Sequence, residues 1–163
     1  FRAAEKTFQL LTQVAGRAGR GDKAGEVFIQ TYNPDHYAIQ LAQHHYYEAF
    51  FAQEMKMRHL AHYPPYYFTV MITVSSEQEY IAQKQAYEIK KILEGKLSSQ
   101  SVLLGPSAKS IARMNNRYYY QLIIKYKKDS VLDILLHEVL VNTQSTPQSK
   151  VAVSIDVEPQ YFL

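Results

Sequence analysis

The sequence predicts an α+β chain in which a mainly helical first part precedes a domain of four strands and two helices. After Tyr66, four segments have the apolar patterns of strands, at 68–74, 102–104, 118–126 and 151–157. Two segments with helical spacing of apolar residues separate them. The resulting order, β-α-β-β-α-β, is the split βαβ order of ferredoxin-like folds.

The first part of the chain opens with a predicted helix. From Arg2 to about Arg20, apolar residues recur at three- and four-residue steps. Gly16 and Gly19 lie within this helix and would weaken it. The run G-E-V-F-I-Q-T-Y at 25–32 then alternates apolar and polar residues, which predicts a strand.

A second helical region is predicted to begin at Asn33-Pro34, with Asn as the cap and Pro at the first helical position. It continues in two pieces up to Tyr63-Pro64-Pro65-Tyr66, because proline disfavours helix at its own position and at the preceding one. We expect the domain boundary near Phe51, which gives two domains, 1–51 and 52–163.

In the second domain, the first strand leads into a helix that begins at a capping box formed by Ser76 and Glu79. Apolar residues at helical spacing predict its inner face, and Gly95 ends it. The residues of this inner face are Ala82, Ala86, Ile89 and Leu93.

The other elements of this domain follow from breakers and alternation. The strand Val102–Leu104 is short because Gly105-Pro106 breaks it, and a linker containing Asn115-Asn116 leads to the strand at 118–126. Ser130 opens the second helix, and the last strand alternates strictly. The inner residues of the second helix are Leu132, Leu136, Val139 and Thr143.

Composition is that of a globular protein: 47% of the 163 residues are hydrophobic and 20% are charged. No apolar run approaches the ~18 residues of a membrane-spanning helix, so no membrane partner is expected. The absence of cysteine excludes disulfides and fits a cytoplasmic protein. The chain begins at Phe1 without a signal sequence, so we expect an excised piece of a longer cytoplasmic protein.

Positive charge is concentrated in one stretch of the sequence. Between Gly95 and Lys128 there are seven basic residues and no acidic one, so the rest of the chain carries 11 − 15 = −4. The seven are Lys96, Lys109, Arg113, Arg117, Lys125, Lys127 and Lys128. This asymmetry indicates an anionic partner, either nucleic acid or an acidic peptide. The alternative is a solvated basic edge strand that discourages aggregation.

The run Q-V-A-G-R-A-G-R at 13–20 is the sharpest local signal. On a helix, Gln13, Arg17 and Arg20 would share one polar face, and Gly16 and Gly19 would leave its surroundings open. Two guanidiniums and a carboxamide suit a polyphosphate, which binds planar, permanently charged donors. The alternative is two surface arginines on an ordinary amphipathic helix.

The spacing Q-x-x-G-R-x-G-R resembles motif VI of superfamily 2 helicases. The similarity extends along the chain to the primosomal protein N′ family of replication-restart helicases. It rests on the run Arg2–Thr12, Gly25–Pro34, Glu54-Met55, Arg58, Tyr63–Tyr66, Leu104–Pro106, Ile111–Arg113, Arg117-Tyr118 and Ile155–Pro159.

This resemblance implies that residues 1–51 end the second RecA-like motor lobe of an ATP-dependent 3′→5′ DNA helicase that recognises stalled forks and restarts replication. Arg17 and Arg20 would contact the γ-phosphate of ATP, and Gln13, with Gly16 and Gly19, would help to position the nucleotide. The resemblance implies ATP and Mg²⁺ in the intact parent and zinc-binding cysteines upstream. The chain alone is expected to be inactive, because the phosphate loop and the magnesium motif are not in it.

For residues 52–163, the resemblance implies binding to forked or single-stranded DNA, to the acidic tail of single-stranded-DNA-binding protein and to other primosome proteins. The residues themselves nominate Lys109, Arg113 and Arg117 for phosphates and Tyr119 for stacking on bases. Alternation places Tyr118 and Tyr120 on the opposite face from Tyr119.

Two alternatives to this interpretation come from the residues. His44-His45 and the pair His59, His62 suggest metal ligands, but without Cys or an acidic cluster we expect packed or solvated histidines and no metal site. The rival function is a non-enzymatic adaptor that binds nucleic acid or protein.

Overall fold

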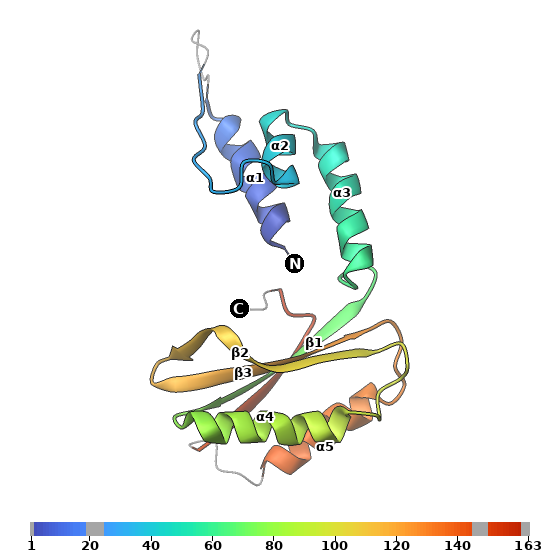
Figure 1. Cartoon of the computed structure of the whole chain (residues 1–163). Coiled ribbons are helices and arrows are strands. Elements are labelled where there is room, and N and C mark those ends of the chain that lie inside the picture. Colours follow the sequence, from blue (N-terminus) through green and yellow to red (C-terminus); the bar gives the residue numbers. More distant parts are fainter. Residues whose placement is uncertain (1, 19–24, 145–149, 161–163) are drawn as a thin grey trace. The chain divides into compact units, whose positions relative to one another are not determined.

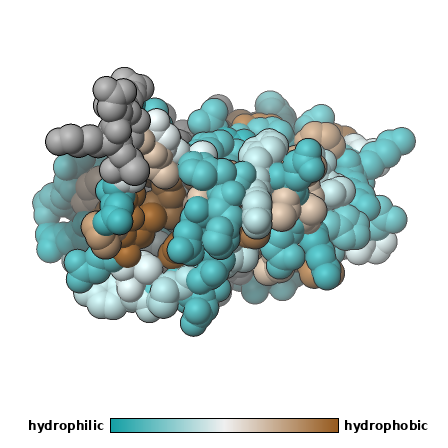
Figure 2. Space-filling view, turned by 90° about the horizontal axis from the view of Figure 1, so that it is seen from above, coloured by the Kyte–Doolittle hydropathy of each residue, from teal (hydrophilic) through white to brown (hydrophobic). Residues whose placement is uncertain are grey.

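The computed structural model describes residues 2–18, 25–144 and 150–160, which belong to two compact units, Phe1–Ala61 and His62–Leu163. The first unit contains the helices α1 (Ala3–Ala15), α2 (Tyr37–Gln43) and α3 (Tyr47–Leu60) (Figure 1). The second contains β1 (Phe68–Ser76), α4 (Glu79–Leu93), β2 (Val102–Met114), β3 (Arg117–Tyr126), α5 (Leu132–Gln144) and β4 (Ala152–Val157). The face seen in Figure 2 is mostly hydrophilic, with local apolar areas.

A small aromatic core holds the three helices of the first unit together. Phe8 of α1 stacks on Phe50 of α3 with ring centroids 4.2 Å apart, and Ala38 and Ala42 of α2 complete the buried set. Because these residues of α2 are small, α1 and α3 can approach it closely with their aromatic side chains. Packing between the helices, rather than propensity within each one, therefore stabilises this unit.

The first helix is shorter than the sequence predicted. α1 ends at Ala15 instead of about Arg20, and Gly16 follows as its C-cap. Arg17 and Ala18 continue in a tight turn, in which their N–H groups donate to the carbonyls of Val14 and Ala15. Glycine interrupts a helix because its backbone loses more conformational freedom on ordering than that of any other residue.

The predicted strand at 25–32 is not a strand in this structure. Its residues pair with no strand among those described, and Phe28 and Tyr32 are exposed. Alternation favours a strand, but a strand also needs a neighbour that accepts and donates its backbone hydrogen bonds.

The helical region after residue 32 is in two pieces, as predicted, but it begins later. His36, not Asn33, caps α2: its Nδ1 accepts a hydrogen bond from the N–H of Ala38. We expected a domain boundary near Phe51, whereas the compact units divide after Ala61, because α3 runs unbroken through Phe51 to Leu60. The Tyr63–Tyr66 run follows the helix end, as predicted.

The second unit is an antiparallel sheet in the order β2-β3-β1-β4, with α4 and α5 on one face (Figure 1). The order of elements along the chain and of strands across the sheet is the split βαβ arrangement that the sequence predicted. The central strand β1 is buried on both faces over most of its length, whereas the sequence predicted a half-buried strand.

The core lies between this sheet and the two helices. All of the predicted inner residues of α4 and α5 are buried, and all except Ala82 and Thr143 belong to this core cluster. Each register pair places side chains of adjacent strands on the same side, so Ile72 lies beside Leu122 of β3 and Ile155 of β4. The apolar faces that the helical and strand periods predicted therefore pack against each other in one layer.

The predicted capping box does not form at the start of α4. β1 continues through Ser76, whose hydroxyl donates to the carbonyl of Lys150 (2.6 Å) and accepts from the N–H of Gln78 (3.2 Å). Glu79 instead accepts a hydrogen bond from the hydroxyl of Tyr120 (3.2 Å). Ser76 is the last residue of β1 and is paired with β3, so it does not cap α4.

The strand β2 is much longer than predicted. It runs through Gly105-Pro106 and on to Met114, and the predicted linker is part of a hairpin with β3. Asn115 and Asn116 both have positive φ, 50° and 61°, as in the type I′ turns that join twisted antiparallel strands. Register shifts between Leu104 and Ser107 accommodate the proline, which cannot donate to the ladder.

Candidate functional site

The polar end of α1 carries the residues that the sequence assigned to a phosphate. Gln13, Gly16 and Arg17 are all exposed. Gln13 lies in the last turn of the helix and Arg17 in the turn that follows, so the helical spacing used to group them ends before Arg17. Gly19 and Arg20 lie outside the described residues.

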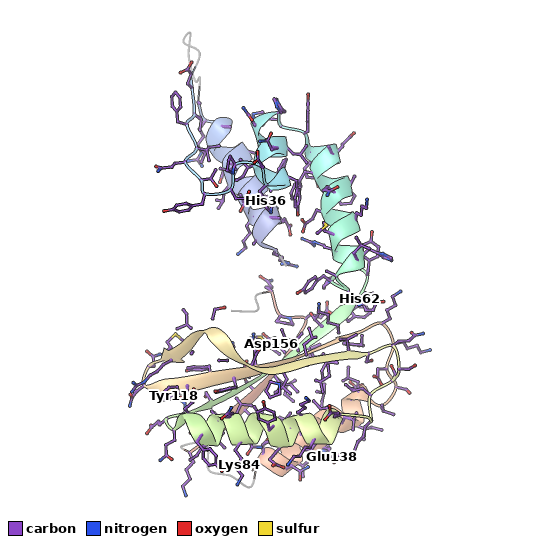
Figure 3. All side chains as sticks on the ribbon, viewed as in Figure 1. His36, His62, Lys84, Tyr118, Glu138 and Asp156 are labelled. Atoms are coloured by element: carbon purple, nitrogen blue, oxygen red, sulfur yellow. The ribbon has the colours of Figure 1, made fainter. Side chains whose placement is uncertain are left out.

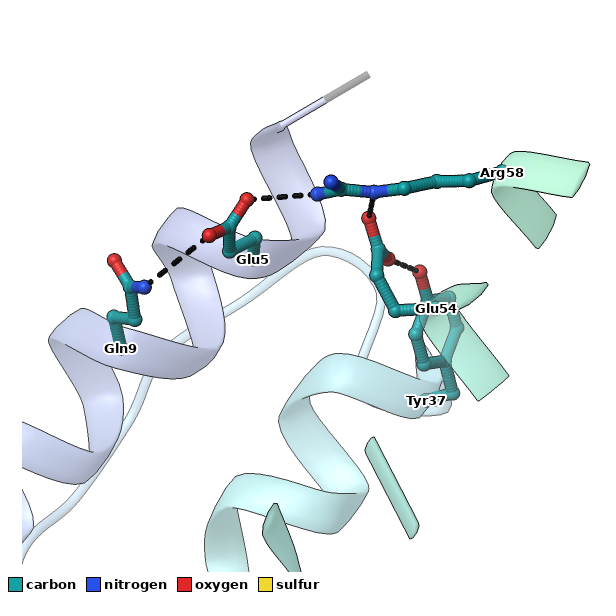
Figure 4. Close-up of polar contacts among 5 residues, drawn as sticks. All are labelled: Glu5, Gln9, Tyr37, Glu54 and Arg58. Carbon is teal, nitrogen blue, oxygen red and sulfur yellow. Dashed lines mark hydrogen bonds and ion pairs between the residues drawn. The ribbon is translucent and has the colours of Figure 1, made fainter. Parts of the chain in front are cut away.

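A buried ionic cluster, which the sequence analysis did not predict, joins the three helices of the first unit (Figure 4). Arg58 of α3 donates from Nη2 to Glu5 of α1 and from Nε to Glu54 of its own helix, both at 2.7 Å. The hydroxyl of Tyr37 on α2 donates to the other oxygen of Glu54 at 2.6 Å. We call Glu5, Tyr37, Glu54 and Arg58 the Arg58 cluster.

Burial makes the Arg58 cluster energetically important. The side chains of Arg58 and Glu54 are 11% and 5% exposed, and that of Glu5 is 35% exposed. Burial and the carboxylate of Glu54 raise the pKa of Tyr37 far above its usual value. Burial alone would lower the pKa of Arg58, but the two carboxylates outweigh it and raise that pKa. The guanidinium therefore stays charged and orients α1 against α3.

One sequence signal pointed to this cluster. Glu54 and Arg58 are four residues apart on a helix, the spacing at which opposite charges pair. Sequence analysis named both residues only as part of the family resemblance. The pairing with Glu5 crosses between helices far apart in sequence, and no local pattern announces it.

The basic stretch is divided between the two ends of β3. Arg113 and Arg117 lie at the hairpin end, whereas Lys127 and Lys128 follow the other end of the strand. The strand has 10 residues. At about 3.3 Å per residue, the two groups are separated by about 30 Å.

At the hairpin end, Arg113 is the more accessible cation. Its guanidinium lies 5.2 Å from the ring centroid of Tyr118 and donates to Oδ1 of Asn116, and the residue is exposed. Arg117 is half-buried and donates to the carbonyl (2.9 Å) and the hydroxyl (3.2 Å) of Ser75. The guanidinium of Arg117 is therefore largely engaged in hydrogen bonds within the sheet.

Lys109 is also partly withdrawn from solvent. Burial lowers its pKa, and the carboxylate of Asp156 on β4 acts against that shift. β2 and β4 are the two edges of the sheet, so the charge of Asp156 acts on Lys109 from the opposite edge.

At the other end, two of the lysines lie near tyrosine rings. The ammonium of Lys125 lies 3.6 Å from the ring centroid of Tyr63, and burial lowers the pKa of this lysine. Lys127 lies 4.9 Å from the ring centroid of Tyr67 but stays exposed, as does Lys128. Lys127 and Lys128 are therefore the accessible cations here.

The three consecutive tyrosines of β3 alternate as predicted. Tyr120 is opposite Val74 and packs against the core, and Tyr118 has the same parity, at the end of the sheet (Figure 3). Tyr119, opposite Ser75, points to the face that α4 and α5 do not cover, and it is half-buried.

Two further observations concern metal and membrane. Among residues 2–18, 25–144 and 150–160, no group of three or more histidines or acidic residues is placed to hold a metal ion. His44 stacks on Tyr46 and His62 packs on Tyr67. In the same part of the chain, no helix is both long enough and apolar enough to cross a membrane.

Comparison with known proteins relates this chain to one family. Residues 59–160 match the family model of the primosomal protein N C-terminal domain. The whole chain is 48% identical to the replication restart protein PriA of Bacillus subtilis over 164 aligned residues, covering 20% of that protein. It is 39% identical over 98% of its length to PriA of Synechocystis, of which it covers 19%. The chain thus spans about a fifth of the length of these relatives.

Proposed function

Because the chain belongs to the family of primosomal protein N C-terminal domains, we propose that it is the C-terminal part of an ATP-dependent 3′→5′ DNA helicase that restarts replication at stalled forks. The observation that carries this proposal is the similarity to PriA over the full length of the chain, through the first unit as well as the family domain. In this proposal, ATP and Mg²⁺ bind mainly to the preceding part of the parent, as does zinc.

The first unit would supply arginine fingers from the end of a RecA-like motor lobe. Gln13 and Arg17 fit this role, because both are exposed and both carry N–H donors suited to phosphate oxygens. The Arg58 cluster supports it, since it orients α1, the helix that leads to Arg17. The roles of Gly16, Gly19 and Arg20 rest on the family resemblance. The segment 25–32, whose residues alternate in the sequence, would add a strand to the motor-lobe sheet.

The second unit would bind DNA and primosome proteins, among them single-stranded-DNA-binding protein. Arg113, Lys127 and Lys128 support this role because they are exposed cations in a stretch without acidic residues. Lys109, Arg117 and Tyr119 are half-buried, so we propose for them a smaller direct share of the contact.

Substitution of the two arginines in the intact parent tests the motor role. Arg17→Ala and Arg20→Ala should each lower the rate of ATP hydrolysis by roughly 10³-fold, the scale of arginine fingers in phosphoryl transfer, and leave DNA affinity unchanged. Lys84→Ala, at an exposed position of α4, is the control and should alter neither. The isolated chain should hydrolyse no ATP in the presence of DNA.

The motor and the adaptor are distinguished by whether the arginine variants lose ATP hydrolysis or DNA affinity. If Arg17→Ala weakened DNA binding and left ATP hydrolysis intact, the arginine would bind backbone phosphates of DNA and not the γ-phosphate of ATP. A parent that hydrolysed no ATP at all would favour the non-enzymatic adaptor. Turnover by the rigorously purified isolated chain would contradict the assignment to a motor that needs its preceding part.

A further inference from the structure

The tip of the β2–β3 hairpin exposes two large apolar side chains. Ile111 is 64% exposed and Met114 is 49% exposed. Ile111 lies in a bulge: Ala108 pairs with Tyr120 and Arg113 with Tyr118, so residues 109–112 of β2 stand opposite Tyr119 alone. Figure 1 shows β2 bowing away from β3 near this end. The extra residues push Ile111 outward from the ladder.

A tight turn joins the two strands at this tip. The turn residues Asn115 and Asn116 have the positive φ values of a two-residue turn. Arg113 is held on the tip by its contacts with Asn116 and the ring of Tyr118. In the sequence, two exposed apolar residues therefore stand on either side of an arginine that makes contacts within the hairpin.

The charge around the tip selects the chemistry of the partner. No acidic residue occurs from Gly95 to Lys128, so the hairpin itself places only cations and neutral residues beside the exposed apolar groups. A partner that matches must place flat apolar surface directly beside negative charge. Nucleic acid does so, since its bases lie between rows of phosphates, and proteins insert isoleucine or methionine between base steps while arginine binds nearby.

We infer that Ile111 and Met114 form a wedge that inserts at a base step of branched DNA, while Arg113 binds an adjacent phosphate. The inference rests on the proposed DNA-binding function of this unit. A branch point is the preferred substrate, because stacking is already interrupted there and separating the bases costs less than within a continuous duplex.

The test is the fluorescence of 2-aminopurine placed at the branch point of a synthetic fork, because unstacking of this base raises its emission. The full chain should raise it. Ile111→Ser with Met114→Ser should abolish the rise and weaken fork binding by about tenfold, the scale of losing buried apolar contacts. The salt dependence of binding should be unchanged, because it counts phosphate contacts. Ile134→Ser is the matched control, since Ile134 on α5 is 68% exposed.

The outcomes separate the wedge from the function on which it rests. The wedge is supported if Ile134→Ser raises the emission as the unaltered chain does and the double variant does not raise it. If the double variant still raised the emission, or if the unaltered chain bound the fork without raising it, the wedge would be wrong and DNA binding would stand. If the unaltered chain bound no DNA at low salt, both would be wrong.

Discussion

At the scale of single residues, Asp129 shows how one carboxylate connects two segments of the second unit. It accepts hydrogen bonds from the hydroxyl of Ser101 (2.6 Å) and from the N–H groups of Ser98 (2.9 Å) and Val131 (3.2 Å). Burial alone would raise the pKa of Asp129, but these donors outweigh it and lower that pKa. The loop before β2 is thereby tied to the start of α5.

Asp129 should make the stability of this unit depend on pH. A carboxylate whose pKa is lower in the folded state stabilises the fold fully above its unfolded pKa, near 3.8, and loses that contribution as pH falls through the folded value. We expect Asp129→Ala to lower the free energy of unfolding by about 1–2 kcal/mol at pH 7, through its lost hydrogen bonds. Urea titrations across the pH range measure this.

The control for Asp129 is Asp129→Asn, which keeps an acceptor oxygen but does not titrate. The difference in stability between the natural chain and Asp129→Asn should shrink as pH falls below about 4. A difference that stayed constant down to pH 2 would show that the carboxylate is not stabilised by folding.

At the scale of elements, the Arg58 cluster connects three helices that share only a small apolar core. Phe8, Ala38 and Phe50 bury the apolar contact, and the ion pairs of Arg58 then restrict how α1 lies against α3. Buried ion pairs add little net stability over apolar groups of the same shape, but removal of one partner leaves a buried charge uncompensated.

Arg58→Ala should therefore destabilise the first unit by about 3 kcal/mol, the low end for buried pairs, because Glu5 stays partly solvated. Amide hydrogen exchange of α1 in the full chain should accelerate accordingly, and Lys84→Ala should change it by less than about 0.5 kcal/mol. Unchanged protection of α1 in Arg58→Ala would show that the aromatic core alone positions this helix.

At the scale of the whole molecule, charge is arranged by the sheet and not by the sequence run. One continuous basic stretch is distributed to two ends of β3 about 30 Å apart, close to one helical turn of duplex DNA. Several of its members are engaged within the fold: Lys125 by Tyr63, Arg117 by Ser75 and Lys109 by burial near Asp156. The electrostatic surface is therefore narrower than the count of seven cations suggests.

The salt dependence of DNA binding by the full chain tests this arrangement. Arg113→Ala should flatten the slope of log affinity against log salt by about 0.7–0.9, and Lys127→Ala with Lys128→Ala by about twice that. Lys109→Ala and Arg117→Ala, added to Arg113→Ala, should each flatten the slope by less than Arg113→Ala does alone, because both residues are half-buried. A slope indifferent to all of these changes would assign the basic stretch to a protein partner.

The sequence by itself determined the elements whose burial follows a strict period. α4 and β3 were predictable because apolar residues such as Ile89 and Leu122 repeat with the pitch of the element that carries them, which is a local property. The split βαβ order followed from those elements. The family resemblance supplied the roles proposed for Gln13, Arg17 and Arg20, which no periodicity could assign.

Only the tertiary structure decided what depends on a distant partner. β2 extends to Met114 because β3 pairs with it, whereas 25–32 stays unpaired despite its alternation. Ser76 bonds Lys150, and Arg58 reaches Glu5, across separations that no local pattern encodes. Hydrogen bonds and ion pairs form between groups that folding brings together. A sequence pattern therefore shows which polar groups need a bonding partner, but it does not identify that partner.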